Sequence, residues 1–548
     1  MDTGVNRGHP LLAPALLEAD TQSWRSEWTA ADLRGHGTEV AGLALYGDLS
    51  GKLMDQEPVT LLHRLESVKI LPNVGHNYPP DYGPITVGSM AMAEQQAPQR
   101  NRAFCMAITA PSDRDAWRPS LWSATIDKAC AGVDDDNRRL LIVSAGNIRE
   151  TVGENYPHEN LLASVEDPGQ SWNALTVGGY TEKIWPDDAT LAGYELIAPR
   201  GGLSPASRTT LSWAEDEWPF KPDVVCEAGN YAKNGHGFVT TTDNLQLLTT
   251  QLVPTSDALL GTTKDTSAAA AQIAGMAATL QGEYPEFWPE TIRGLIVHSA
   301  EWTPRMLEEF TFTSRQRRLR VYGWGVPDLE RARRSARGIA TMVVQEEIQP
   351  YRLNGSEAKT NELHLHNLPL PRDVLLDLGS TLVRMRLTLS YFVEPNPSRR
   401  GWTARYRYAS HGLRFDVRRP EETRERMLNR LSSASWPTTN QRSRRPPQTV
   451  ISDAREWELR SQLQTRGSIH SDYWTGTAAT LANSDIVAIY PVTGWWREQP
   501  RLGFVEKRTR YALIVTISTD AADIELYQAV DDEIAIRART ETAISTQT

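Results

Sequence analysis

Three short motifs hold the side chains of a nucleophile, a base and an acid. Asp2 stands in DTGV, His36 in GHGTEVAG and Ser267 in DTSAAAAQIAG. A serine hydroxyl is a weak nucleophile at neutral pH and needs an adjacent general base, which His36 would supply. The base needs a carboxylate that fixes its tautomer and stabilises the imidazolium, and Asp2 would do this. The chain order Asp, His, Ser is one of several in which this triad occurs.

A fourth motif could stabilise the negative charge of a tetrahedral intermediate. SAGN at 144–147 follows the apolar run LLIV and puts the amide of Asn147 where an oxyanion donor is needed. Loss of one such donor typically costs about 10²–10³ in rate. The structural alternative is an ordinary Gly-Asn turn after a strand. The place of SAGN after a buried strand, between the His and Ser motifs, favours the functional interpretation.

Each motif also has a purely structural explanation. Ser267 opens an Ala-rich helix, whose dipole would favour an oxyanion, but it could be only the N-cap of that helix. A second Gly-His-Gly stands at 235–237, where Phe238 follows and no helix is expected, so this His236 is assigned to a loop. His298, in LIVHSA, is expected to be a core histidine. His36 is therefore the expected base.

Together the four motifs resemble those of the subtilases, the subtilisin-like serine peptidases of the S8 family. The resemblance spans about residues 1–330 and includes weaker similarity at SVKIL, ITVGSMAMA and PASRTTLSW. It implies a triad of Asp2, His36 and Ser267, with Asn147 in the oxyanion hole. It further implies that a peptide substrate adds as a β-strand along four residues. These are Met106, Ala107, Ile108 and Thr109.

The sequence departs from the family pattern in the cleft but not in its proton-transfer groups. The family usually has Gly at Asp265, His at Glu39, and Pro-His at 271–272, where this chain has Ala-Gln. The usual Ser-Leu-Gly substrate strand is replaced by Ala-Ile-Thr at 107–109. The chemistry is expected to survive these changes, whereas the substrate specificity is left open.

The family fold also places a central strand directly before the triad acid. Only Met1 precedes DTGV here. We therefore expect either that an N-terminal part is missing from the chain or that another segment fills that position in the sheet. Without the strand, sheet edges would be exposed and Asp2 would be held loosely.

The elements that must position these residues follow an α/β pattern over 1–340. Short apolar runs alternate with helical stretches, which is typical of a parallel sheet with flanking helices. The expected strands are 67–71, 103–108, 140–145, 174–179 and 222–228, and the expected helices are 87–97, 120–132, 267–281 and 289–300.

The pattern changes in 341–548, where a mainly-β domain, a β-sandwich, is expected. Period-2 strands are expected at 362–368, 382–392, 404–417, 485–492 and 510–518, and 418–463 is expected to be a charged insertion, helical at first and then Pro-rich. The region resembles, loosely, the C-terminal β-domain of bacterial intracellular subtilases. That resemblance implies an AAA-type ATPase partner and a role in defence against phage.

Composition argues against several other classes of protein. The net charge of −10 argues against a general nucleic-acid binder, although arginines and aromatics gather in 399–419. No apolar run approaches a membrane span and no signal peptide is seen, so a cytoplasmic protein without a membrane anchor is expected. The three cysteines have no metal-ligand spacing and are expected to be buried thiols, while Asp134–Asp136 is expected to be a solvated turn. No cofactor is expected; a structural calcium ion is possible in this family but is not indicated.

The sequence therefore predicts a serine endopeptidase that cleaves peptide bonds through an acyl-enzyme. The alternative is a catalytically inactive subtilase-fold scaffold that binds a partner such as an ATPase. A serine esterase is a third possibility. Labelling of Ser267 by a fluorophosphonate would distinguish the enzymes from the scaffold, and ester and peptide substrates would distinguish the two enzymes.

Overall fold

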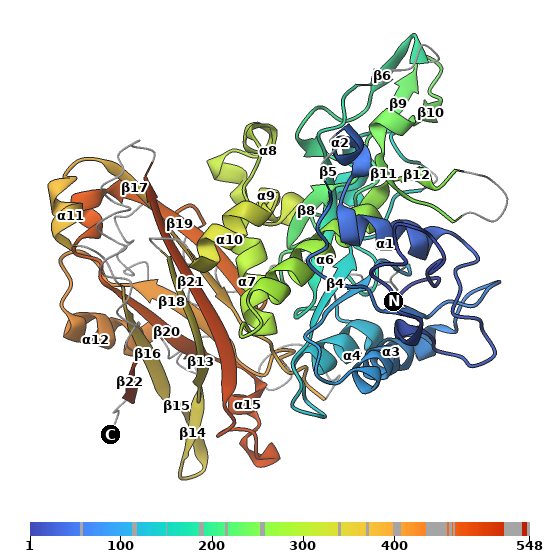
Figure 1. Ribbon diagram of the computed structural model, residues 1–548. Helices are drawn as coiled ribbons and strands as arrows, with labels where there is room; N and C mark the ends of the chain where they lie inside the picture. The colour runs from blue at the N-terminus through green and yellow to red at the C-terminus, as the bar shows by residue number, and fades with distance from the viewer. Residues whose placement is uncertain are drawn as a thin grey trace. The chain divides into compact units, whose positions relative to one another are not determined.

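The computed structural model covers the chain and divides it into two compact units, Met1–Leu329 and Glu330–Thr548 (Figure 1). The sequence analysis placed this boundary near residue 340. The structure describes all residues except 55–57, 112–117, 150, 186–190, 214–217, 253–257, 338–340, 369–371, 398–406, 435–456, 460–462, 464–465, 520–539 and 545–548.

The centre of unit 1 is a mainly parallel sheet. Strands β3 (Ala103–Met106), β4 (Leu140–Ser144), β5 (Leu175–Thr181) and β8 (Val224–Glu227) pair in parallel in that order. The short β7 (Gly202–Leu203) adds antiparallel to β5. Every residue of β4 is buried, as expected for a strand covered on both faces. The five strands predicted from the sequence for this unit are all present.

A second parallel pair lies beside Asp2 in unit 1. It consists of β1 (Thr21–Ser23) and β2 (Ser67–Lys69). Helix α3 (Tyr82–Gln96) contacts both of these strands and packs on α4 (Leu121–Cys130). The side chain of Ser120 caps α4, and the left-handed Gly132 follows its end.

Two helices carry the predicted base, His36, and the predicted nucleophile, Ser267. Helix α1 (His36–Tyr46) packs against α6 (Asp265–Glu283), and α6 crosses β3, β4, β5 and β8. A Cβ on Gly275 of α6 would lie 2.2 Å from the carbonyl oxygen of Ala44, so glycine permits the close approach of these helices. The other elements near α1 and α6 are α2 (Leu49–Met54), α7 (Pro289–Ser299) and the hairpin of β11 (Leu247–Thr250) and β12 (Leu260–Thr263).

The remaining elements of unit 1 surround this centre. A three-stranded sheet has the order β10-β9-β6. Its strands are β6 (Tyr194–Leu196), β9 (Ala232–Asn234) and β10 (Val239–Thr240), and the other helices are α5 (His158–Leu162), α8 (Pro304–Glu309) and α9 (Arg315–Tyr322). Helix α10 (Leu329–Arg337) begins at the last residue of unit 1 and belongs to unit 2 from Glu330 on. None of these three strands was predicted, because runs of two or three residues leave no readable period.

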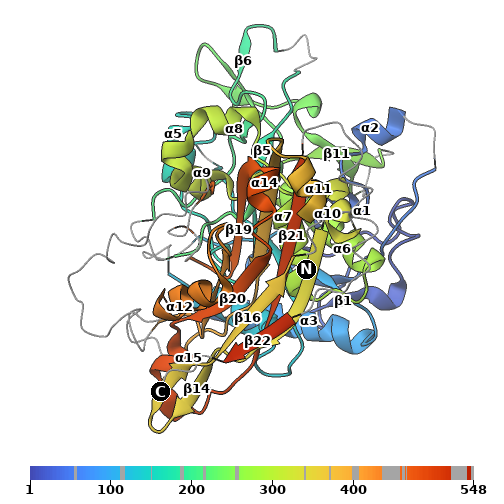
Figure 2. The ribbon, with the colours of Figure 1, turned by 90° about the vertical axis from the view of Figure 1, so that its left-hand side faces the viewer.

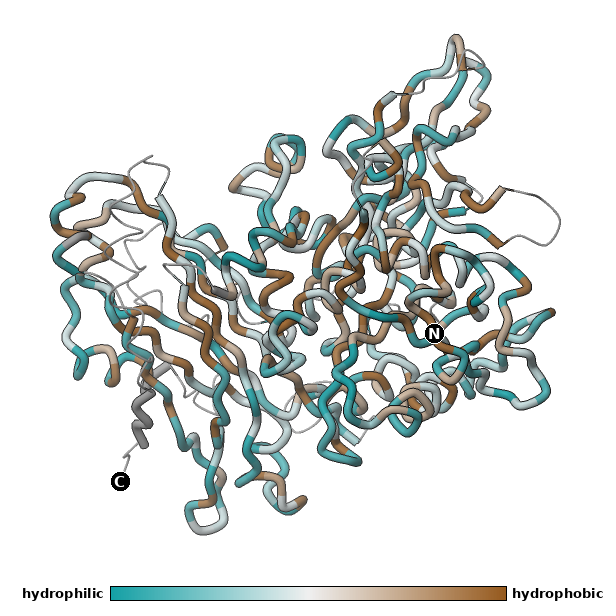
Figure 3. The backbone as a smooth tube through the Cα atoms, viewed as in Figure 1, coloured by the Kyte–Doolittle hydropathy of each residue, from teal (hydrophilic) through white to brown (hydrophobic). Residues whose placement is uncertain are grey.

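Unit 2 is a β-sandwich of two four-stranded antiparallel sheets, with strand orders β13-β21-β17-β19 and β18-β20-β16-β22 (Figures 1 and 2). The strands alternate hydrophobic and hydrophilic residues (Figure 3), and β18 alternates half-buried with buried positions. The hydroxyl of Tyr511 on β21 hydrogen-bonds with His364 and His366 on β16, which joins the inner faces of the two sheets. The bounds are β13 (Thr341–Ile348), β16 (Glu362–Asn367), β17 (Leu382–Ser390), β18 (Gly412–Val417), β19 (Ile469–Thr477), β20 (Ile486–Val492), β21 (Thr509–Thr519) and β22 (Thr540–Ile544).

Most of the strands predicted for 341–548 are present, with one correction. The strand expected over 404–417 begins only at Gly412: residues 404–406 lie outside the described residues, and Ser410 instead donates its N–H to the carbonyl of Glu394. The helix expected at the start of 418–463 is α12 (Arg424–Ala434), and the Pro-rich part that follows lies outside the described residues. Smaller elements are β14 (Tyr351–Asn354), β15 (Glu357–Thr360), α11 (Arg372–Asp377), α14 (Ala478–Leu481) and α15 (Trp495–Glu498).

Throughout the described part of the chain, every helix is too short or too polar to cross a bilayer.

Candidate active site

Asp2 is held in the sheet by its backbone. Its N–H donates to the carbonyl of Val68 at 3.3 Å, and its carbonyl accepts from the N–H of Ile70 at 2.9 Å. On the other side, the α-ammonium group of Met1 donates to the carbonyl of Cys105 at 3.0 Å. Residues 1–2 therefore lie between β2 and β3, and Asp2 is only 6% exposed. The expectation that Asp2 is held loosely was wrong, because two residues are enough to make these contacts.

His36 is the first residue of α1 and faces the triad acid. Its Nδ1 lies 2.8 Å from Oδ1 of Asp2, and Thr3 donates its N–H to the same oxygen at 2.7 Å. A Cβ on Gly37 would lie 1.9 Å from the carbonyl oxygen of Gly4, so the start of α1 can approach the DTGV turn only with glycine at this position. The sequence prediction of an Asp–His pair is thus realised in the structure.

Asp32 connects the DTGV segment to the start of α1, and its role was not predicted from the sequence. Its carboxylate is 3% exposed and accepts the hydroxyl of Thr3, which follows the acid. The same carboxylate accepts four hydrogen bonds from the loop that leads into α1 and from the first turn of that helix. Their donors are the backbone N–H groups of Arg34, Gly35 and Thr38 and the hydroxyl of Thr38. An acid four residues before the histidine of a Gly-His-Gly turn is a signal that could have been used.

The pair is electrostatically coupled. The carboxylate of Asp2 raises the pKa of His36 to about 9, against the opposing effect of burial. Burial opposes ionisation of Asp2, but the charge and hydrogen bond of His36 hold the pKa of that carboxyl below its usual value. Asp2 is therefore ionised at neutral pH and stabilises the imidazolium form of His36.

This coupling predicts an alkaline rise in activity. A general base works only when neutral, so kcat/KM should increase with pH up to about 9, the pKa of His36. In Asp2→Asn the pH midpoint of the kcat/KM profile should move toward about 6.5, and kcat should fall by about 10⁴. Initial rates between about pH 6 and 10 measure this. A wild-type midpoint near that of an ordinary histidine would contradict the coupling.

The same shift fixes the sign of the effect on stability. Because the folded pKa of His36 is raised, its stabilising contribution is complete below about 6.5, the unfolded value. It is lost as the pH rises toward about 9. The urea concentration at which half of the protein is unfolded should therefore fall between about pH 6.5 and 9 in wild type. It should fall less in Asp2→Asn.

Ser267 lies in the first turn of α6 and is 8% exposed. The N-cap of α6 is Lys264, and no side chain caps the helix there, so the N-cap alternative for Ser267 was wrong. Its hydroxyl donates to the carbonyl of Ala107 at 3.0 Å. Among the hydrogen bonds of the described residues, none joins Ser267 to His36. In apo enzymes catalytic hydrogen bonds often form only when substrate binds.

Asn147 is oriented by the residue that precedes the serine. Its Oδ1 accepts the N–H of Thr266 at 3.0 Å and the hydroxyl of Thr266 at 2.6 Å. Both bonds are made by the amide oxygen. The amide nitrogen, Nδ2, has no hydrogen-bond partner among the described residues and is free to donate. An oxyanion formed at Ser267 needs such a donor. Thr266 was missed by sequence reasoning, because its role appears only when the two segments meet.

Removing the Thr266 hydroxyl should reduce turnover without weakening substrate binding. In Thr266→Val the N–H bond to Asn147 persists and one hydrogen bond of about 1 kcal/mol is lost. We expect kcat to fall about fivefold with KM nearly unchanged, measured on a peptide substrate. Thr266→Ser should restore kcat, and Thr279→Val, near the other end of α6, should leave it unchanged. A rise in KM alone would contradict a role in orienting Asn147.

The four residues predicted to bind substrate fall into two groups in the structure. Met106 belongs to β3 and is fully buried, and its Sδ accepts the hydroxyl of Thr86 from α3, so its side chain faces away from any substrate. Residues 107–109 follow β3 with no strand partner among the described residues. Ala107, Ile108 and Thr109 thus offer a backbone edge next to Ser267.

A partly buried ion pair connects this edge to the Asn147 loop, and it was not predicted from the sequence. Glu166, 8% exposed, accepts the hydroxyl of Thr109. Arg208 pairs with Glu166 at 3.1 Å and donates to the carbonyl of Asn147 at 3.1 Å. Because these groups come from distant segments, no local motif announces them.

The departure at Asp265 has a conformational explanation. Its φ is +71°, in the left-handed region that favours glycine. Asp tolerates this region better than most residues. The hydroxyl of Tyr231 donates a hydrogen bond to Oδ1 of Asp265 at 2.7 Å, which fixes the orientation of the Asp265 side chain.

The histidines set aside in the sequence analysis lie as expected. His236 is exposed in the turn between β9 and β10, and His298 is buried in α7.

The cysteines Cys105, Cys130 and Cys226 are free thiols, and burial raises the pKa of each. Within the described ranges, no group of three or more His, Cys, Asp or Glu side chains is arranged to hold a metal ion.

An acid, a base, a serine at a helix start and an amide donor, all set around a parallel sheet, are the groups that a serine peptidase of the Asp-His-Ser type would need. The family model described as "Subtilase family" (peptidase S8) matches residues 1–325. The chain belongs to the subtilase family.

Two solved structures illustrate the likeness. An S41 psychrophilic protease is 20% identical, with a TM-score of 0.37, over 55% of this chain and 81% of its own. A lanthipeptide protease is 17% identical, with a TM-score of 0.39, over 60% of this chain and 84% of its own. A search of the curated proteins finds no match.

Proposed function

We propose that the protein is a serine endopeptidase that hydrolyses peptide bonds through an acyl-enzyme on Ser267. The observation that carries the proposal is the Asp2–His36 contact of 2.8 Å in a chain whose Asn147 amide is oriented beside Ser267 by Thr266. These are the groups that acyl transfer requires: a base with a fixed tautomer, a nucleophile and an oxyanion donor.

The reaction has two halves. Ser267 Oγ attacks the peptide carbonyl while His36 Nε2 accepts the hydroxyl proton, and Asn147 Nδ2 donates to the oxyanion. The intermediate collapses when His36 returns the proton to the leaving amine, which leaves an ester on Ser267. Water then attacks the ester with His36 as base, and the acid product departs. Asp2 stays ionised throughout and stabilises the imidazolium.

Before attack, the Ser267 hydroxyl must leave the carbonyl of Ala107. A peptide strand that pairs with 107–109 would bring its carbonyl to this point, and rotation about χ1 of Ser267 would turn the hydroxyl from Ala107 toward base and substrate. The open backbone edge favours a peptide over a simple ester, because a strand gains main-chain hydrogen bonds that a small ester lacks.

The test combines labelling with substrate choice. A fluorophosphonate should label Ser267 and stop cleavage of an unfolded protein substrate, and an extended peptide should be cleaved with a higher kcat/KM than a small ester of the same acyl group. Labelling with ester cleavage alone would favour an esterase. Absence of labelling at every pH would favour the scaffold alternative.

The finer expectations stay predictions. The ATPase partner, the role in phage defence and the cytoplasmic location rest on the loose resemblance of 341–548 and on composition. Co-purification with an ATPase would support the first.

A further inference from the structure

Glu39 follows the predicted base by one turn on helix α1. His36 and Glu39 are three residues apart, so their side chains are neighbours on the helix surface. One carboxylate oxygen, Oε1, turns back toward the N-cap, where a Cβ on Gly35 would lie 3.7 Å from it. The other, Oε2, accepts a hydrogen bond from the hydroxyl of Thr263 at 2.9 Å. Glu39 therefore lies beside the base and contacts the segment that leads to Ser267.

The hydrogen bond between Glu39 and Thr263 joins the segments that carry the base and the nucleophile. Thr263 is the last residue of β12, and Ser267 follows four residues later in the first turn of α6. On the paired strand β11, the hydroxyl of Thr249 donates to the backbone carbonyl of Glu39 at 2.9 Å. Because no hydrogen bond of the described residues joins Ser267 to His36, the approach of base to nucleophile depends on how this hairpin holds α1.

The charge of Glu39 is not balanced by a basic side chain. Among the ion pairs of the described residues, none includes Glu39. Lys264, which follows Thr263, lies 3.8 Å from the carboxylate of Asp265 and over the ring of Tyr231 instead. The strands β11 and β12 carry no charged residue. The positive charge nearest in the chain is then the imidazolium form of the base, on the same turn of α1.

The charged groups around His36 fall into those that act on it and those directed elsewhere. Its pKa is raised to about 9 mainly by Asp2, and the charges of Glu39 and Asp32 add to this effect, whereas burial opposes it. Arg34, in the loop before α1, instead donates its guanidinium to the carbonyls of residues 73 and 75. The base is thus surrounded by three carboxylates.

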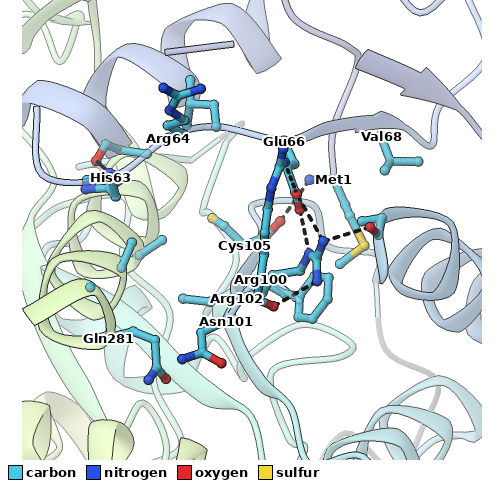
Figure 4. A pocket seen from close by; sticks show the side chains of 18 of the residues that line it. Met1, His63, Arg64, Glu66, Val68, Arg100, Asn101, Arg102, Cys105 and Gln281 are labelled. Atoms are coloured by element: carbon cyan, nitrogen blue, oxygen red, sulfur yellow. Dashed lines mark hydrogen bonds and ion pairs between the residues drawn. The ribbon is translucent and has the colours of Figure 1, made fainter. Parts of the chain in front are cut away.

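The other elements near α1 add no competing charge. Helix α6 carries only two charged residues, Asp265 at its start and Glu283 at its end. The cavity of about 420 Å³ in unit 1 is lined by α1 only at Ala44, eight residues after His36. Its one acid, Glu66, lies 2.6 Å from the guanidinium of Arg102 and 2.7 Å from that of Arg100, so these charges balance one another (Figure 4).

We propose that Glu39 is a positioning residue for the catalytic base. Its carboxylate fixes the first turn of α1 to the strand that leads to Ser267, and its charge stabilises the imidazolium that forms on His36 during acyl transfer. The histidine that usually stands at this position in the family could not supply this negative charge. The inference rests on the proposed function, because it requires His36 to act as the base.

The first test measures the effect of the charge without catalysis. Glu39→Gln keeps an oxygen that can accept the Thr263 hydroxyl and removes only the charge. In a Ser267→Ala background, the imidazole of His36 is titrated by NMR with carbon-13-labelled histidine. We expect its midpoint to fall by about 0.4 of a pH unit in Glu39→Gln. The difference should shrink in about 1 M NaCl, where the Debye length is about 3 Å.

Glu283→Gln is the matched control for this charge. It removes an acid at the opposite end of α6, about 24 Å from Ser267 by the helical rise, and should leave the His36 midpoint unchanged. The same midpoint in Glu39→Gln and in the Glu283→Gln control overturns the proposal.

The second test measures the effect of the hydrogen bond. Thr263→Val keeps the shape of the side chain and the charge of Glu39 but removes the hydroxyl. We expect kcat on a peptide substrate to fall about fivefold with KM nearly unchanged, while the His36 midpoint moves by less than about 0.2. Thr263→Ser should restore kcat. Thr262→Val, whose hydroxyl bonds Asp243 instead, should keep wild-type kcat. Equal kcat in the two valine variants overturns the positioning role.

The two measurements separate this inference from the proposed function. A wild-type chain that neither reacts with a fluorophosphonate nor cleaves peptide overturns the proposed function, and the role of Glu39 in turnover falls with it. An active chain whose His36 midpoint is the same with Glu39 and with Gln at this position overturns the inference about Glu39 alone.

Discussion

Replacing Ser267 by Ala should abolish both fluorophosphonate labelling and peptide cleavage. The change removes only the hydroxyl, and the residual rate should be that of a site with binding and oxyanion donors but no nucleophile. In subtilisin, loss of the nucleophile costs about 10⁶ in kcat, and we expect a loss of this order here. The measurement is kcat on a peptide substrate, with labelled residues mapped by mass spectrometry.

The fold of this variant should be intact, because the hydroxyl of Ser267 makes a single hydrogen bond, to Ala107, in the described structure. Urea midpoints of Ser267→Ala and wild type should therefore agree closely. Labelling that persists in the variant would show that another residue is the nucleophile, and cleavage that persists without labelling would point to a contaminating protease.

The candidate catalytic groups could be predicted from the sequence because their motifs are local. DTGV, GHGTEVAG and the Ser267 motif each contain the reacting side chain and the small residues that let it approach the others. The structure then joined Asp2 to His36 and Asn147 to the start of α6.

The groups that hold the reacting side chains in place could not be predicted in the same way. Asp32 binds both Thr3 and the loop before α1, and Glu166 with Arg208 connects three distant segments. Such roles depend on tertiary contacts between residues that are far apart in sequence. The pKa of His36 is likewise set by Asp2 across 34 positions, and composition does not reveal it.

The fold itself was predictable where elements are long or strongly apolar. The fully buried β4 and the Ala-rich α6 are clear from sequence alone. Short strands such as β9 and β10 are not, because tertiary pairing rather than period defines them. For the sheet position before Asp2, the sequence left open a missing N-terminal part or another segment, and the structure places residues 1–2 between β2 and β3.

Replacing His36 by Ala should cost about as much as the loss of Ser267, near 10⁶ in kcat, because base and nucleophile act as a unit. For the same reason, the double variant His36→Ala/Ser267→Ala should be no slower than either single variant. Additive losses would instead mean that the two residues act independently, and the triad assignment would fail.

The chain contains its own control for this experiment. His236 stands in a second Gly-His-Gly but is exposed in a turn. Its backbone N–H donates to Oδ1 of Asn234 at 3.0 Å, and Asp2, the predicted triad acid, is far from it in sequence. His236→Ala should therefore keep wild-type kcat, labelling and pH dependence, whereas His36→Ala should lose labelling although Ser267 is present. The comparison tests the motif apart from its surroundings. The histidine of Gly-His-Gly is expected to act as a base only at His36, where Asp2 faces the imidazole and α6 packs against α1.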